Sequence, residues 1–222
     1  MLLKEKISLT GAGRTDSGVN ARNYVAHFDS SNMHNFESDY IIYKTNAILA
    51  SDIVIYAITA VPENAHARFD AISREYKYMI HTTKDPFASQ YSYYYHFPVD
   101  LDRMNLAARA FLGRQDFSSL EKLHGGNTNS ICEVYEAGWK ETSAGHYVFT
   151  VRANRFLRNM VRAMVGSLLE VGRGKREPEW IRTMLEAKDR GAAGNSVPGN
   201  ALFLNKVEYP EPLEELICRI QY

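Results

Sequence analysis

The sequence predicts an α+β fold in which a mainly antiparallel sheet carries helices on one face. Three observations lead to this prediction. The run 74–82 alternates apolar and polar residues in the manner of a half-buried strand. The run 156–171 repeats apolar residues at helical spacing. The runs 131–141 and 147–153 flank a glycine-containing turn and predict an antiparallel pair, and chains that mix hairpins with helices typically form such layers.

The first part of the chain predicts a small α+β half, which ends at a proline and two polar residues at 62–64. We therefore expect two domains, with limits at 1–64 and 65–222. The elements expected in the first are strands at 7–10, 24–29 and 53–61, the last of them buried, and a helix over 38–49 with Ser38 as its N-cap.

The second part predicts the larger half, in which Tyr76, Tyr78 and Ile80 share one face of the strand 74–82. Helix boundaries are indicated by Gly113 and Gly172 as terminators and by Pro178 in a first turn. The further elements expected here are strands at 92–99 and 202–209, and helices over 101–112, 156–171 and from Pro178 onward.

Composition limits the class of protein. The chain has 222 residues, 45% of them apolar and 23% charged, which is ordinary for a globular protein and excludes disorder or a coiled coil as a description of the whole chain. The longest nearly apolar run, 53–61, is far shorter than the roughly 20 residues that span a bilayer, so we expect no membrane partner. The start of the chain turns charged at once and predicts no signal peptide.

The two cysteines, Cys132 and Cys218, lie far apart and fit no zinc spacing, and the histidines form no metal motif. We therefore expect no metal. So few cysteines favour a reducing compartment, and we expect the protein in the cytoplasm.

The charge is unevenly distributed. Twenty-six basic and 26 acidic residues balance overall, but the segment 152–176 holds seven basic residues and one acidic residue, a net charge of +6. On a helical wheel Arg155, Arg158 and Arg162 fall within about 60° of one another, opposite the apolar stripe. No acidic residue follows them at helical spacing. Such a stripe suits a phosphate backbone, and an inner arginine could meet a carboxylate; a solvated face is the equally weighted alternative.

The glycine-rich turn at 11–18 is not a phosphate cradle. A dinucleotide fingerprint needs a third glycine where Asp16 stands, and a Walker A loop needs a lysine that is absent. The turn does present a carboxylate directly after a strand, and Arg14, two residues earlier, points the same way in an extended chain. From the residues alone, an aspartate that caps its own turn is the favoured interpretation of Asp16.

Aromatic residues form the third candidate. Tyr76 is flanked by Arg74 and Lys77, and aromatic rings beside basic residues can stack on unpaired RNA bases. For most aromatic residues of the predicted sheet, ordinary core packing is the favoured interpretation.

Taken together, these segments resemble the tRNA pseudouridine synthase A family. Asn20 and Ala65 stand where the family usually has histidine and phenylalanine. The matching motifs follow in family order over nearly the whole chain: Gly-Ala-Gly-Arg-Thr-Asp-Ser-Gly-Val at 11–19, His-Ala-Arg-Phe-Asp-Ala at 66–71 with Arg-Glu-Tyr-Lys-Tyr at 74–78, Asp-Phe-Ser-Ser at 116–119, Phe-Leu-Arg-Asn-Met-Val-Arg at 156–162, and Ala-Leu-Phe-Leu at 201–204.

The resemblance implies an isomerase that converts uridine to pseudouridine in the anticodon stem-loop of tRNA, at tRNA positions 38–40. It implies a cytoplasmic homodimer that uses no metal or organic cofactor. The implied fold is two ferredoxin-like halves that form one mainly antiparallel sheet, with an active-site cleft between them. Family members have a first strand and most of a helix before the motif at 11–19, so the N-terminal half is expected to be incomplete here.

The resemblance also assigns the site residues. Asp16 becomes the catalytic carboxylate, which can attack the base, attack the sugar or remove a sugar proton. Arg162 becomes its counter-charge. Substrate-binding roles fall to Tyr76 on the extruded ring, to Arg14 in the vacated space or on a phosphate, and to Leu204 as an apolar wall; Arg155 and Arg158 are expected on the RNA backbone.

Two alternatives remain. A truncated, catalytically impaired relative would bind tRNA without turning it over, although intact Arg14, Asp16, Tyr76 and Arg162 argue against simple decay. A nucleotide-binding enzyme would use the glycine-rich turn, but the carboxylate of Asp16 would repel a pyrophosphate.

Overall fold

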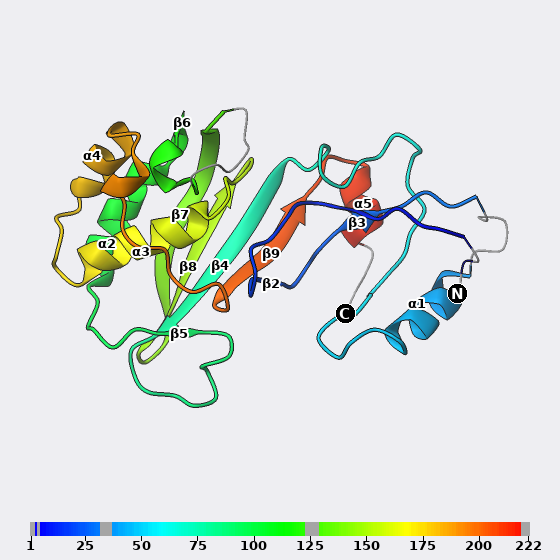
Figure 1. Cartoon of the computed structure of the whole chain (residues 1–222), viewed down its shortest axis with the longest axis horizontal. Helices are drawn as coiled ribbons and strands as arrows, with labels where there is room; N and C mark the ends of the chain where they lie inside the picture. Colours follow the sequence, from blue (N-terminus) through cyan, green and yellow to red (C-terminus); the bar gives the residue numbers. More distant parts are fainter. Residues whose placement is uncertain (1–2, 4, 32–36, 123–128, 219–222) are drawn as a thin grey trace. The chain divides into compact units, whose positions relative to one another are not determined.

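The computed structural model describes residues 3, 5–31, 37–122 and 129–218. The chain divides into two compact units, each described here by itself (Figure 1). The first, called the sheet unit, comprises Arg14–Tyr24 and Ser73–Val207. The second unit comprises Met1–Gly13, Val25–Ile72 and Glu208–Tyr222.

The sheet unit is built on a seven-stranded, mainly antiparallel sheet, which confirms the predicted fold class. Its long strands pair antiparallel, β4 with β8, β8 with β7 and β7 with β6, whereas the two-residue strands β2 and β5 run parallel to β9 and β4. In spatial order the strands are β2 (Asn20–Ala21), β9 (Leu202–Glu208), β4 (Ser73–His81), β8 (His146–Ala153), β7 (Ile131–Ser143) and β6 (Gly113–Asp116), with β5 (Tyr93–Tyr94) paired to β4.

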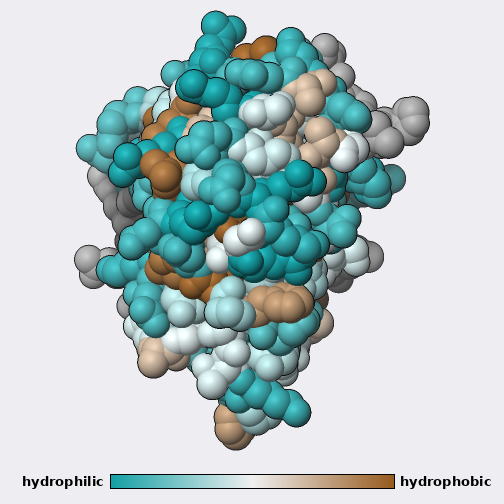
Figure 2. Space-filling view, turned by 90° about the vertical axis from the view of Figure 1, so that its left-hand side faces the viewer, coloured by the Kyte–Doolittle hydropathy of each residue, from teal (hydrophilic) through white to brown (hydrophobic). Residues whose placement is uncertain are grey.

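Three helices lie together beside the sheet in Figure 1: α2 (Leu101–Ala108), α3 (Met160–Gly172) and α4 (Trp180–Glu186). All residues of α3 are buried except Arg162 and Glu170. Figure 2 views the side on which α4 lies, and this surface is mainly hydrophilic with small, separated hydrophobic patches. The apolar faces of the helices therefore point inward. The core joins Tyr78, Ile80, Phe149 and Val151 of the sheet to Met104, Met164 and Leu168 of the helices.

The strand at 74–82 and the hairpin were predicted with nearly the observed limits. The connection between β7 and β8 turns at Gly145, whose φ of 74° is a conformation that glycine adopts without strain. The Asp100 side chain caps α2 by accepting a hydrogen bond from the Arg103 N–H at 3.0 Å. The predicted helix over 101–112 ends earlier as α2 and continues as the 3₁₀ turn Arg109–Phe111. The predicted strand at 92–99 shortens to β5.

The basic helix differs from the prediction. It starts at Met160 rather than at residue 156, because Asn159 has a left-handed backbone with φ of 69°. Arg155 and Arg158 therefore precede the helix, and the predicted arginine stripe on one helical face is wrong. Hydrophobic periodicity did not reveal this break, because Leu157 is buried from the preceding turn as it would be from a helix.

The second unit contains short elements. Strands β1 (Thr10–Gly11) and β3 (Ala26–His27) pair antiparallel and are shorter than predicted. Helix α1 (Ser38–Asn46) begins after Glu37, so Ser38 is not its N-cap. Helix α5 spans Leu213–Cys218.

The predicted buried strand at 53–61 is wrong. This segment forms no strand, and Ile53, Val54 and Tyr56 are each more than half exposed. The Asn46 side chain, rather than a neighbouring strand, bonds both the N–H and the C=O of Ile55, each at 2.8 Å. The prediction failed because an apolar run becomes a buried strand only where another element packs on it, and this segment pairs with no strand among the described residues.

None of the helices within the described ranges has both the length and the apolar character needed to cross a bilayer.

Candidate active site

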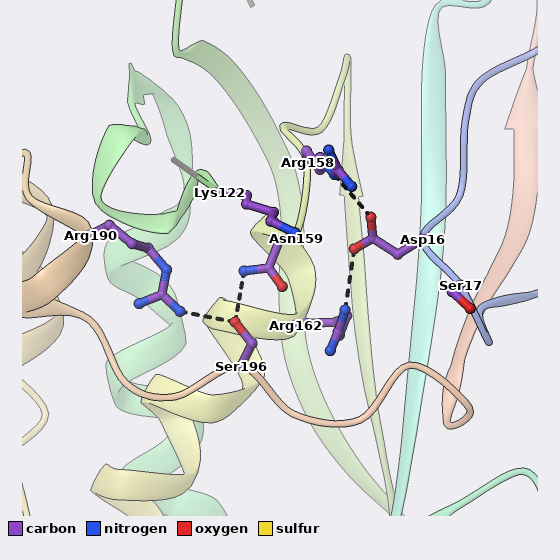
Figure 3. Close-up of a pocket in the computed structure, with 8 residues that line it drawn as sticks. All are labelled: Asp16, Ser17, Lys122, Arg158, Asn159, Arg162, Arg190 and Ser196. Atoms are coloured by element: carbon purple, nitrogen blue, oxygen red, sulfur yellow. Dashed lines mark hydrogen bonds and ion pairs between the residues drawn. The ribbon is translucent and has the colours of Figure 1, made fainter. Parts of the chain in front are cut away.

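A cavity of about 590 Å³ lies in the sheet unit and is here called the Asp16 cavity (Figure 3). It contains four basic side chains and one carboxylate, a net charge of +3. The lining residues are Asp16, Ser17, Lys122, Arg158, Asn159, Arg162, Arg190 and Ser196.

The turn that carries Asp16 is fixed by its neighbours. The Val19 N–H donates to the Asp16 carbonyl at 3.1 Å, and Gly18 has a φ of 78°. A Cβ at Gly199 would approach the Ser17 carbonyl to 2.8 Å, so the turn before β9 packs directly on this backbone. The position of Asp16 is therefore set by the strand β9 as well as by its own turn.

The Asp16 carboxylate pairs with two arginines. Its Oδ2 lies 3.3 Å from Arg162 Nη1, and its Oδ1 lies 3.5 Å from Arg158 Nε. The Asp16 and Arg162 side chains are 21% and 24% exposed, whereas Arg158 is 55% exposed. The carboxylate thus meets the half-buried guanidinium of Arg162 and the largely exposed guanidinium of Arg158, and it stays accessible from the cavity (Figure 3).

The two arginines are held differently. Arg162 lies in the first turn of α3, and its Nε donates to the Val197 carbonyl at 2.7 Å. The Val197 N–H returns a bond to the Arg162 carbonyl at 3.3 Å. Arg158 lies before the helix, and its carbonyl accepts from the Lys122 N–H at 3.0 Å. Arg162 is therefore anchored through its guanidinium, and Arg158 through its backbone.

Opposite Asp16, a polar cluster closes the cavity. Arg190 Nη2 and Asn159 Nδ2 both donate to the Ser196 hydroxyl oxygen, at 2.9 and 2.7 Å. Arg190 Nη1 also donates to the Gly194 carbonyl at 3.2 Å. These bonds tie the segment 190–196 to Asn159, the residue directly before α3.

The same segment packs on α3 through glycine. A Cβ at Gly166 would lie 1.8 Å from the Asn195 carbonyl oxygen, a distance that no side chain can accept. The Gly194 N–H donates to the Ser167 hydroxyl at 3.0 Å. Gly166 therefore permits the close approach that brings Ser196 and Arg190 to the cavity.

Tyr76 lies on β4 and is half-buried. Its ring meets Phe156 edge-on, with ring centroids 5.0 Å apart and an interplanar angle of 84°. Burial raises the pKa of Tyr76 to about 12, and the negative charge of Asp16 adds to this rise while Arg74 opposes it. The hydroxyl is therefore protonated at neutral pH.

The structure brings only part of the predicted set to the Asp16 cavity. Asp16, Arg158 and Arg162 line it, whereas Tyr76, Arg14, Leu204 and Arg155 do not. Arg14 is exposed, and Leu204 is buried in β9 with 2% exposure. Arg155 Nη1 contacts Asn129 Oδ1 at 3.4 Å. The roles assigned to all seven residues stay predictions.

Five lining residues were not predicted: Ser17, Lys122, Asn159, Arg190 and Ser196. Ser17 and Asn159 lie inside the motifs and could have been selected as polar neighbours of Asp16 and Arg158. Lys122 and Arg190 could not have been selected from the sequence, because neither belongs to a motif or to a regular spacing of functional residues.

Within the described part of the chain, no group of three or more histidine, cysteine, aspartate or glutamate side chains is placed to hold a metal. His34 and His124, and the side chain of Cys218, lie outside that part.

Comparison with known proteins identifies the family. A family profile for tRNA pseudouridine synthase matches residues 107–210. The chain is 47% identical over 213 residues to tRNA pseudouridine synthase A of Bacteroides fragilis, covering 96% of this chain and 84% of that protein. It is 47% identical to the protein of the same name from Bacteroides thetaiotaomicron, covering 95% and 78%, and 36% identical to that from Bacillus subtilis, covering 93% and 83%. Because such identity extends over nearly all of the chain and most of each relative, the chain belongs to the tRNA pseudouridine synthase A family.

Proposed function

We propose that this chain is a tRNA pseudouridine synthase, an isomerase that converts uridine in tRNA to pseudouridine with Asp16 as its catalytic carboxylate. One observation carries the proposal beyond the family relationship. Asp16 is an accessible carboxylate in a cavity of about 590 Å³ that is otherwise lined by basic and neutral polar side chains. A positively charged cavity suits a polyanionic substrate.

The reaction explains why a carboxylate is needed. Isomerisation breaks the bond from N1 of uracil to C1′ of the ribose and forms a bond from C5 to C1′. The hydrogen on C5 leaves as a proton, and N1 gains a proton, so no oxidant or reductant is consumed. A carboxylate can open this sequence by attacking the base, attacking the sugar or removing a sugar proton. All three routes use Asp16 in its ionised form, opposite Arg158 and Arg162.

The target uridine must leave its base stack before it can reach Asp16, at a cost of a few kcal/mol. We propose that the Tyr76 ring packs on the extruded base and that Leu204 contributes an apolar wall. Arg14, which is exposed, would fill the vacated space or hold a phosphate. Arg155 and Arg158 would contact the RNA backbone; the 55% exposure of Arg158 supports this role.

The finer expectations rest on the family resemblance. We propose that the target lies at tRNA positions 38–40 in the anticodon stem-loop. We also propose a cytoplasmic homodimer with two ferredoxin-like halves, divided at residues 64 and 65. The order of the motifs along the chain supports these proposals.

Tritium release tests the activity directly. A tRNA whose uridines carry tritium at C5 is incubated with the purified chain, and the positions of pseudouridine in the product are mapped. We expect release that matches pseudouridine at positions 38–40. Binding of tRNA with no release would instead identify the chain as a catalytically impaired tRNA-binding relative, and release with pseudouridine elsewhere would reject the anticodon stem-loop assignment.

A further inference from the structure

On the side away from Asp16, the wall of the cavity consists of two cationic and two neutral polar residues: Lys122, Arg190, Asn159 and Ser196. We call these residues the cationic wall. Figure 3 shows Arg190, Ser196 and Asn159 joined by hydrogen bonds on the side of the cavity opposite Asp16. The motifs that define the family resemblance do not explain Lys122 or Arg190.

The charge of this wall is not neutralised by the protein. Asp16, the single carboxylate of the cavity, contacts Arg158 and Arg162. Within the described residues, neither Lys122 nor Arg190 contacts an acidic side chain, and Arg190 donates only to a carbonyl and to the Ser196 hydroxyl. Two positive charges therefore face the cavity without a counter-charge.

The two neutral residues of the wall also leave one hydrogen-bond donor available to a ligand. The Ser196 oxygen accepts from both Asn159 and Arg190, which occupies both of its lone pairs. Its own hydrogen has no acceptor among the described residues. Were the Asn159 amide turned over, Ser196 would donate to it, and the amide N–H groups would be left over instead. In either orientation a donor remains for a ligand.

A ligand that meets two cations without a counter-charge and a free hydrogen-bond donor should be an anion rich in acceptor oxygens. Uracil is neutral and cannot offset the charge of the wall. A phosphodiester carries one negative charge and two unesterified oxygens, and both lysine and arginine bind phosphate well.

We propose that the cationic wall is a binding subsite for a phosphodiester of the RNA, next to the nucleotide that reaches Asp16. Lys122, which is exposed, supplies a point charge, and Arg190 supplies a guanidinium held in place by Ser196 and Gly194. The segment 190–196 that carries Arg190 is fixed on α3, so the subsite is formed before RNA binds. This inference rests on the proposed function for the identity of its ligand.

Lys122→Gln is the variant that tests the subsite, because Lys122 is exposed and its side chain forms no hydrogen bond or ion pair with the described residues. The matched control is Lys140→Gln, an exposed lysine on β7 outside the cavity. The affinity for an unmodified tRNA transcript is measured across a range of salt concentrations. We expect the slope of log affinity against log salt to fall in magnitude by about 0.7–0.9 for Lys122→Gln, the value of one phosphate contact, and to stay unchanged for the control.

Neutral linkages locate the phosphate. A methylphosphonate replaces, one at a time, each linkage beside the target uridine. At one linkage the replacement should weaken binding to the wild type several-fold and weaken binding to Lys122→Gln by less, because only Arg190 then still faces that phosphate. An unchanged salt slope for Lys122→Gln, an equal loss in the control, or full additivity at every linkage would overturn the subsite.

Parallel measurement of tritium release separates the two proposals. Release with an unchanged slope rejects the subsite and leaves the isomerase assignment intact. A slope that depends on Lys122 without any release supports the subsite and rejects the isomerase assignment.

Discussion

The two sides of the Asp16 cavity differ in how their charges are balanced. On the Asp16 side a carboxylate meets two guanidinium groups, at 3.3 and 3.5 Å. On the cationic wall, Arg190 donates to neutral groups only, and Lys122 pairs with no acidic side chain within the described residues. The first arrangement holds a reactive group within the protein, whereas the second leaves positive charge for something that the protein does not supply. The difference suggests that one side performs chemistry and the other binds substrate.

The two sides also share a support. Arg162 Nε on the Asp16 side donates to Val197, and the cationic wall is carried by the adjoining segment 190–196. Gly166 lets this segment approach α3 closely. A substitution at one side should therefore change that side alone, whereas a substitution in the support should change both.

The largest effect is expected from Asp16→Asn. Asparagine is nearly the same size but can act neither as a nucleophile nor as a base in this reaction, so tritium release from tRNA should be abolished. Affinity for tRNA should stay within about tenfold, because loss of a negative charge does not weaken attraction to phosphate. Release at the wild-type rate would contradict the catalytic role of Asp16.

Gly166→Ala should disturb both sides at once. The new methyl group would meet the Asn195 carbonyl, so the segment must move, at a cost of about 1–3 kcal/mol in the free energy of unfolding. A lower melting temperature should accompany weaker tRNA binding and slower release. The control is Gly138→Ala on β7, where the nearest atom lies at an ordinary 3.6 Å. Equal melting temperatures for the two variants would show that the segment is not held by this contact.

Tyr76 sharpens the comparison, because it stands outside the cavity lining. Tyr76→Leu should weaken productive binding by about 1–3 kcal/mol if the ring stacks on the extruded base. Tyr76→Phe keeps the ring and should retain tRNA binding. Because the pKa of Tyr76 is about 12, its ionisation should not appear in the rate of the wild-type protein below pH 10. A single-turnover rate for Tyr76→Leu equal to wild type would show that Tyr76 only packs the core.

The smallest effect is expected from the two arginines on stability. Arg162→Gln removes the bond to Val197 as well as the pair with Asp16, and should lower the free energy of unfolding by about 1 kcal/mol or more. Arg158→Gln removes a largely exposed pair and should change it by less than about 1 kcal/mol. Thermal melting compares them, and the reverse order would show that Arg158 is the structural partner. The Arg158 variant should still flatten the salt dependence of tRNA binding if that residue contacts RNA.

The sequence determined the fold class and the larger elements of the sheet unit. Strand β4, the hairpin of β7 and β8, and most of α3 follow from local apolar periodicity, which reflects which face of each element is buried. The charge of the segment 152–176 and the motif at 11–19 also selected Asp16, Arg158 and Arg162, which the structure brings into one cavity.

Tertiary structure alone decided three other features. The apolar run at 53–61 stays largely exposed and forms no strand, because burial depends on a partner element rather than on the run itself. Asn159 takes a left-handed backbone and moves Arg155 and Arg158 out of the helix, which no periodicity records. Lys122 and Arg190 line the same cavity although they are distant in sequence. Only long-range packing brings them together, and no local sequence pattern indicates that they share a site.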